Sequence, residues 1–207
     1  MPALSSAELA ELHALRDTYL VRKAVLLDTL PTSLAASRSI HVRLRKLSAL
    51  TSALLCALWR RADLPHNMAL LAVGGFGRSQ LFPHSDVDVL LLLPGNTTAA
   101  DASAVQQPIE TFIQSCWDVG LEIGASVRTV GECLREAAQD VTVQTSLLES
   151  RRVCGNVALA AHFQEQFMAH LDVHAFRIAK TLEMQQRHTK YEDTPYALEP
   201  NCKESPG

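Results

Sequence analysis

The sequence predicts an α/β fold of the α+β kind, in which a mixed sheet is flanked by N-terminal and C-terminal helices. Two short apolar runs, 70–73 and 89–93, are typical of buried strands because glycine and proline bound them. The glycine-rich stretch 74–78 lies between them. The order strand, turn, strand, helix, strand and helix predicts a core at residues 67–155 of the 207-residue chain.

The N-terminal segment, residues 1–66, is predicted to hold two helices. Ser5 and Glu8 have the spacing of a capping box, and Pro31 is expected to end the first helix. The second helix is expected from about residue 35 to 61. Each helix carries an apolar stripe at helical spacing.

The remaining elements follow the second strand. They are a helix at 102–118, a strand at 121–130, a helix at 131–147, a short strand within 149–155, and a helical extension at 156–190 that stays helical from 157 to about 187. Trp117 and Ile178 are expected in the core. Residues 191–207 have a polar, proline-bearing composition and are predicted to begin a linker.

The residues with chemical potential cluster around the glycine-rich stretch. Asp86 and Asp88 are two apart, so on a strand both project from the same face while Val87 turns into the core. Paired carboxylates repel each other and are usually held by a divalent cation; Mg²⁺ prefers carboxylate and phosphate oxygens. Gly74 and Gly75 allow backbone N–H groups to approach a phosphate. The combination predicts phosphoryl or nucleotidyl transfer.

Other phosphate-binding loops fit this stretch less well. A P-loop needs Gly-Lys-Ser/Thr after four spacer residues, and no lysine is near. A dinucleotide fingerprint needs a third glycine where Gln80 stands and a helix directly afterwards, which Pro83 opposes.

Several motifs make the family resemblance visible. They are Gly74-Gly75-Phe76-Gly77-Arg78 with 81–88 (Leu-Phe-Pro-His-Ser-Asp-Val-Asp), and the segments 117–129, 145–151 and 196–207. On these the chain resembles, from about residue 70 to its end, the nucleotidyltransferase domain of the PII uridylyltransferase family, which belongs to the polymerase-β-like superfamily. The glycine and aspartate motifs alone indicate only the superfamily, and the later segments make the assignment specific.

The resemblance implies a reaction and its participants. UMP would pass from UTP to a tyrosine hydroxyl of the PII signalling protein, with Mg²⁺ as cofactor, in glutamine-responsive nitrogen regulation. The chain would be an N-terminal fragment of a bifunctional enzyme. The uridylyl-removing phosphohydrolase domain would be absent from it, and glutamine sensing is expected only in the full-length protein.

The resemblance also implies roles for individual residues. Asp86 and Asp88 would be catalytic and hold two Mg²⁺ ions. The nucleotide-binding residues would be Gly74, Gly75, Gly77, Arg78, Ser85 and Arg128. A third catalytic carboxylate is expected, and two candidates stay open: Glu149, which we favour for its Glu-x-Arg setting, and Glu122, on the polar side of the strand 121–130.

Two other functions remain as alternatives. One is a different nucleotidyltransferase subclass, such as adenylyl transfer. The other is a catalytically silent nucleotide-binding module, although the intact aspartates oppose it.

Composition narrows the partners and the compartment. A net charge of −3 gives no basic footprint for nucleic acid. Five scattered cysteines, without a Cys-x-x-Cys, form neither a disulfide framework nor a zinc site and fit a reducing cytoplasm. No apolar run reaches the ~18–20 residues that span a bilayer, so no membrane partner is expected.

Overall fold

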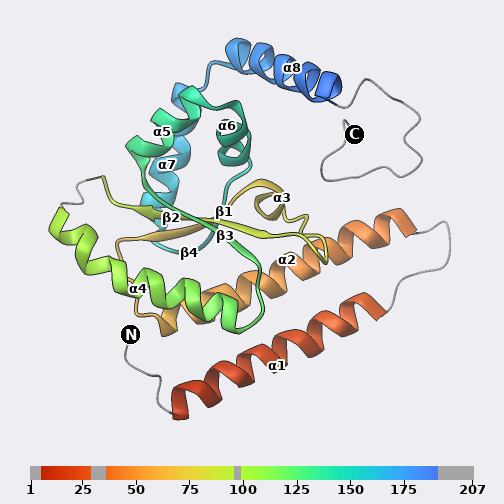
Figure 1. The fold of residues 1–207 in the computed structure, drawn as a ribbon, viewed down its shortest axis with the longest axis vertical. Helices are drawn as coiled ribbons and strands as arrows, with labels where there is room; N and C mark the ends of the chain where they lie inside the picture. Colours follow the sequence, from red (N-terminus) through yellow and green to blue (C-terminus); the bar gives the residue numbers. More distant parts are fainter. Residues whose placement is uncertain (1–5, 29–35, 96–98, 191–207) are drawn as a thin grey trace.

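The chain folds around one four-stranded sheet with helices against both faces (Figure 1). The structure is a computed structural model and describes residues 6–28, 36–95 and 99–190. Its strands are β1 (Ala69–Ala72), β2 (Val87–Leu93), β3 (Ile123–Thr129) and β4 (Arg151–Gly155). Its helices are α1 (Ser6–Asp28), α2 (Ala36–Arg61), α3 (Gly74–Gly77), α4 (Ala99–Asp118), α5 (Val130–Gln139), α6 (Val141–Leu148), α7 (Val157–His170) and α8 (Val173–Lys190).

The sheet is mixed, as predicted, with the strand order β3-β2-β1-β4. β1 pairs antiparallel with β2 and β4, whereas β2 pairs parallel with β3. The parallel pair is joined through α4, as a parallel connection requires a long crossover. These findings confirm the α+β class.

Alternation along β2 divides the core between the two faces of the sheet. Val87, Val89 and Leu91 pack into a cluster that α1, α2 and α4 cover. Leu90 and Leu92 pack into a second cluster with α5, α6 and α7. Figure 1 shows the two sets of helices on opposite sides of the sheet. Both faces of β2 are therefore buried beyond Asp88, which explains its continuous apolar run.

Two predicted helices are each broken in two. We expected one helix at 131–147 and another from 157 to about 187. The first is interrupted at Asp140, whose carboxylate accepts from Thr142 N at 2.6 Å and Val143 N at 3.3 Å. The second break lies at Asp172, which accepts from the amides at the start of α8. In both cases an aspartate side chain satisfies the first amides of a new helix, which favours a break over continuation.

Several predicted boundaries and burials differ from the structure. The strand expected at 121–130 is shorter and lies at the edge of the sheet, so Val127 is exposed. Trp117 was expected in the core but is 56% exposed, because α4 turns Phe112 and Cys116 inward and leaves Trp117 on its outer side. Ile178 is also exposed.

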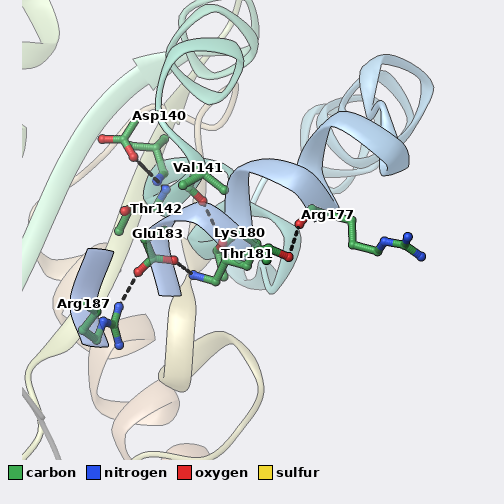
Figure 2. A network of polar contacts seen from close by, with 10 residues as sticks. Asp140, Val141, Thr142, Arg177, Lys180, Thr181, Glu183 and Arg187 are labelled. Atoms are coloured by element: carbon green, nitrogen blue, oxygen red, sulfur yellow. Dashed lines mark hydrogen bonds and ion pairs between the residues drawn. The ribbon is translucent and has the colours of Figure 1, made fainter. Parts of the chain in front are cut away.

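The face of α8 toward the start of α6 carries a network of charged side chains. Glu183 accepts Lys180 Nζ at 2.5 Å and also pairs with Arg187, as Figure 2 shows. These contacts within α8 lie beside the start of α6 (Figure 2).

Three sequence expectations fall outside the described residues: Ser5 of the capping box, the helix end at Pro31 and the linker at 191–207. Among the helices that are described, none has the length and apolar character needed to cross a membrane.

Candidate active site

The glycine-rich stretch forms a single helical turn, α3, between the buried strands β1 and β2. Val73 N donates to Asp88 O at 3.1 Å, which holds the end of β1 against the start of β2. Gly74 has a φ of +56°, a left-handed value that favours glycine. The chain can therefore turn sharply at Gly74 and place α3 above the start of β2.

The amides of this turn fall into two groups. Gly77 N donates to Val73 O at 3.0 Å and Arg78 N to Gly74 O at 3.1 Å. The earlier amides, those of Gly74, Gly75 and Phe76, have no acceptor within a helical turn by its geometry. The first turn of a helix is its electropositive end, so this part of α3 is suited to an anionic group.

The two predicted aspartates lie beside α3 on one face of the sheet. Asp86 and Asp88 are exposed, whereas Val87 between them is 3% exposed. Asp88 pairs with Gly124 of β3, and a Cβ at Gly124 would lie 2.5 Å from Asp88 Oδ1. The absence of a side chain at Gly124 therefore leaves the space that the Asp88 carboxylate uses.

A cleft of about 600 Å³ joins these parts of the site. It is lined by residues of α3, of the segment 78–85 and of β2, including Gly75, Arg78, Ser85, Asp86 and Asp88. Two carboxylates, the cationic Arg78 and Gly75 of α3 thus line the same cleft. Such a cleft can hold a polyphosphate and an accompanying cation.

The donor set fits Mg²⁺. Within the described residues, no group of three or more His, Cys, Asp or Glu side chains is gathered as a metal site. The pair Asp86 and Asp88 supplies hard oxygen ligands from one face, and the remaining positions would fall to water and to phosphate oxygens, as is usual for Mg²⁺.

The structure pairs Arg78 with Glu149. The two side chains form an ion pair, and Arg78 Nε also donates to Gln80 Oε1 at 3.1 Å. Glu149 lies at the C-terminal end of α6, not at the start of a strand, and its carbonyl sits where a Cβ on Gly77 would be. Gly77 therefore allows α3 and Glu149 to approach closely.

The second candidate carboxylate, Glu122, lies directly before β3 and is not among the residues that line the cleft beside α3. Its carbonyl accepts Val87 N at 2.7 Å, and its side chain is exposed. With Asp86, Trp117 and Gly124 it lines a neighbouring hollow of about 580 Å³. The structure thus brings Glu122 near Asp86 and Glu149 near Arg78, and the choice between them stays open.

Arg128 is not brought into the cleft. It lies four residues beyond Gly124 on β3 and pairs with Glu136 of α5 at 2.6 Å. At about 3.3 Å per residue along a strand, this places its backbone roughly 13 Å from the level of Asp88. A phosphate role for Arg128 stays a prediction.

Sequence reasoning missed Arg151, which holds α3 in place from β4. Its guanidinium donates to the carbonyls of Phe76 and Gly77, each at 3.3 Å, and lies 5.4 Å from the Phe76 ring centre. A third bond reaches Ser52 Oγ on α2. Burial lowers the pKa of Arg151 from its ordinary value. The Glu-x-Arg pattern was the available signal, but we assigned it to Glu149 alone.

The fold and this cleft together define an α+β core of the nucleotidyltransferase kind. A family profile described as GlnD PII-uridylyltransferase matches residues 175–207, most of which lie outside the described part. The chain is 49% identical over 203 residues to a bifunctional uridylyltransferase/uridylyl-removing enzyme of Cupriavidus metallidurans, covering 98% of this chain and 23% of the relative.

Two further relatives carry the same description. The Burkholderia thailandensis enzyme is 50% identical over 206 residues, covering 100% of this chain and 22% of that relative. The Burkholderia pseudomallei enzyme is 58% identical over 161 residues, covering 78% of this chain and 18% of that relative. The predicted resemblance to the PII uridylyltransferase family is confirmed, and two of these relatives also match the part of the chain before residue 70. The chain spans about a fifth of the length of these relatives.

Proposed function

We propose that this chain carries the uridylyl-transferring site of such an enzyme and moves UMP from UTP to a tyrosine hydroxyl of a PII protein. The observation that carries the proposal is the pair Asp86, directly before β2, and Asp88, its second residue, which line one cleft together with Gly75 of α3. The relatives' names and the family description support a uridylyl group as the group transferred and a PII protein as its acceptor.

In this reaction the tyrosine oxygen attacks the α-phosphorus of UTP. A Tyr O–P bond forms, the bond to the bridging oxygen breaks, and pyrophosphate leaves. The tyrosine proton passes to a carboxylate of the cleft, directly or through water, since the ordinary phenol pKa of ~10 leaves the group protonated near neutrality.

The chain's own groups bind and orient the nucleotide. The amides of Gly74 and Gly75 would donate to phosphate oxygens, and the Arg78 guanidinium would leave Glu149 to pair with the same phosphates. Release of Arg78 would free the Glu149 carboxylate at the edge of the cleft. Asp86 and Asp88 would hold Mg²⁺, which offsets phosphate charge and favours in-line displacement when bound.

The test uses α-labelled UTP, Mg²⁺ and a PII protein, with label on the acceptor as the readout. We expect transfer that stops when Mg²⁺ is chelated. Asp86→Asn and Asp88→Asn should each lower the rate by more than tenfold, about 1.4 kcal/mol, while thermal melting stays at or slightly above that of the unchanged chain.

The matched control is Asp17→Asn, a carboxylate on the exposed side of α1, which should transfer label normally. Transfer from ATP in place of UTP would support adenylyl transfer. Nucleotide binding without transfer to any acceptor would support a silent regulatory module. Rates within tenfold of normal for both aspartate variants would contradict their role as metal ligands.

A further inference from the structure

Two cysteines meet at the β4 edge of the sheet, which is the edge opposite β3. Cys56 on α2 and Cys154 on β4 both line a hollow of about 440 Å³, together with Arg60, Asp63 and His66. Both cysteines are half-buried. Cys56 Sγ also lies 3.5 Å from the carbonyl of Val153, to which the thiol donates.

A β-bulge in β4 directs Cys154 toward α2. Leu70 pairs with Cys154 and Leu71 with Arg152, so Val153 is the extra residue between two consecutive pairs. In a regular strand Val153 and Cys154 would point to opposite faces. Here both pack against the cluster that α2 covers, because a bulge changes the alternation. Cys154 therefore lies on the side of the sheet that α2 covers, where it lines the same hollow as Cys56.

We propose that Cys56 and Cys154 form a redox-active dithiol site, in which Cys56 is the attacking thiol and Cys154 resolves it as a reversible disulfide under peroxide. The proposal does not depend on the nucleotide chemistry, since the hollow shares no lining residue with the cleft beside α3.

The charges around the hollow favour Cys56 as the nucleophile. The hydrogen bond from Cys154 is the main cause that lowers the pKa of Cys56 to about 7, and Arg60, Arg152 and Arg151 lower it further against the opposing effect of burial. The bond between the two thiols raises the pKa of Cys154.

When Cys56 is deprotonated it loses its hydrogen bond to the Val153 carbonyl, and Cys154, which stays protonated, donates to the Cys56 thiolate instead. Thiolate reactivity depends on this kind of electropositive, partly exposed setting. Asp63 and His66 are the other titratable groups of the hollow.

The atoms balance with hydrogen peroxide as the oxidant. The Cys56 thiolate attacks a peroxide oxygen, the O–O bond breaks, and a sulfenic acid and hydroxide form. The Cys154 sulfur then attacks the sulfenic sulfur, the S–O bond breaks, and water leaves as the S–S bond forms. In sum, two thiols and one peroxide yield one disulfide and two waters, and a thiol reductant reverses the step.

The other cysteines provide an internal contrast. Cys116 and Cys133 are fully buried, and burial raises the pKa of each to about 12. They should stay reduced under conditions that oxidise Cys56. Cys202 lies outside the described residues, so the experiment uses the 207-residue chain with Cys202→Ser throughout.

The test treats this chain with equimolar hydrogen peroxide, blocks free thiols and digests it with trypsin without reduction. Cleavage after Lys46, Arg60, Arg152 and Arg177 places Cys56 in peptide 47–60 and Cys154 in peptide 153–177. We expect these two peptides to be linked, with the loss of two hydrogen atoms, and to separate after reduction.

Single variants separate the two roles. Cys154→Ser should stop the reaction at a Cys56 sulfenic acid that a dimedone probe labels, whereas Cys56→Ser should leave Cys154 unlabelled. The oxidation rate should rise with pH through about 7. Arg60→Gln should slow oxidation several-fold at neutral pH, and Arg60→Lys, which keeps the charge, should slow it less.

Four results would overturn the proposal. The first is peroxide treatment that leaves the peptides 47–60 and 153–177 unlinked. The second is labelling of Cys116 or Cys133 at the rate of Cys56. The third is a Cys154→Ser variant that collects no sulfenic acid while circular dichroism shows it folded. Linkage in the absence of peroxide that resists reduction would likewise contradict a reversible site.

Discussion

At the scale of single residues, the three glycines of α3 do different work. Gly74 provides a left-handed backbone, Gly75 leaves an amide at the open end of the turn, and Gly77 allows the Glu149 carbonyl to pack against it. The sequence pattern predicted a phosphate loop from all three. Gly77 differs from the other two glycines because it packs against Glu149, over seventy positions further along the chain. A local sequence pattern does not contain that information.

The contrast between Gly75 and Gly77 is testable by substitution with alanine. A Cβ on Gly75 would meet Gln80 O at 3.7 Å, an ordinary contact, so Gly75→Ala should change the free energy of unfolding by less than about 1 kcal/mol. A Cβ on Gly77 would overlap the Glu149 carbonyl, so Gly77→Ala should destabilise the fold by about 1–3 kcal/mol. Urea denaturation measures both, and equal midpoints would show that the packing at Gly77 is loose.

The positions of single residues also explain which parts of the candidate site could be predicted from the sequence. Asp86 and Asp88 are two positions apart at the start of β2, and the turn at Gly74 lies only fourteen residues before Asp88, so strand periodicity and the short connection were enough to predict that they lie together. Arg128 and Glu149 depend on which neighbours their long side chains reach, and the structure gives them Glu136 and Arg78. Local sequence patterns predict the face of a helix or strand from which a side chain projects. Tertiary packing decides which other residue that side chain contacts.

At the scale of elements, α3 is fixed from outside because four residues cannot hold a helix by themselves. Arg151 of β4 supplies this support through the carbonyls of Phe76 and Gly77. Hydrogen bonds from a charged group contribute ~1.5–3 kcal/mol each. The loss of these bonds should therefore loosen α3, the turn that we propose to contact the nucleotide.

We therefore expect Arg151→Met to lower the free energy of unfolding by about 1.5–3 kcal/mol or more and to weaken Mg²⁺-UTP binding. Arg152→Met is the matched control, because the neighbouring Arg152 is exposed and donates to Gly155 O at 3.3 Å, away from α3. Calorimetric titration with UTP and urea denaturation measure the two effects. Unchanged UTP affinity in a destabilised Arg151→Met protein would limit Arg151 to a structural role.

The break between α5 and α6 makes an element-scale prediction about pH. Hydrogen bonds from the Thr142 and Val143 amides lower the pKa of Asp140 from its ordinary value of 3.8. The cap is therefore fully stabilising above pH 3.8 and is lost as the pH falls through the lower value in the folded state. Asp140→Ala should cost about 0.5–2 kcal/mol at pH 7.

Because the variant has already lost the cap, its stability should fall less than that of the unchanged chain between pH 5 and pH 3. Denaturation at a series of pH values measures the difference. Parallel curves would show that Asp140 makes no charge-dependent contact. The sequence analysis missed this cap because the apolar periodicity continues across residues 131–147 and predicts one helix. An aspartate at this position starts a new helix only where tertiary packing turns the chain, and that packing cannot be predicted from the local sequence.

At the scale of the whole molecule, the N-terminal helices belong to the same core as the sheet. Leu12 and Tyr19 of α1 are buried in the cluster that contains Leu70 and Val89. Tyr19 Oη also lies 3.2 Å from Thr51 Oγ1, and burial raises the pKa of Tyr19. A segment that shares its core with β1 and β2 should unfold together with them.

Leu12→Ala tests this coupling, because the side chain is 2% exposed and its loss should cost about 2–5 kcal/mol. Trp59, which packs edge-on against Phe112 at 5.9 Å, reports on the core next to the sheet. The exposed Trp117 can be replaced by phenylalanine to isolate its signal. If the molecule unfolds as one unit, Trp59 fluorescence and far-ultraviolet circular dichroism will both shift to the same lower midpoint. A Trp59 midpoint that stays in place while part of the helical signal melts earlier would show that α1 folds independently of the site.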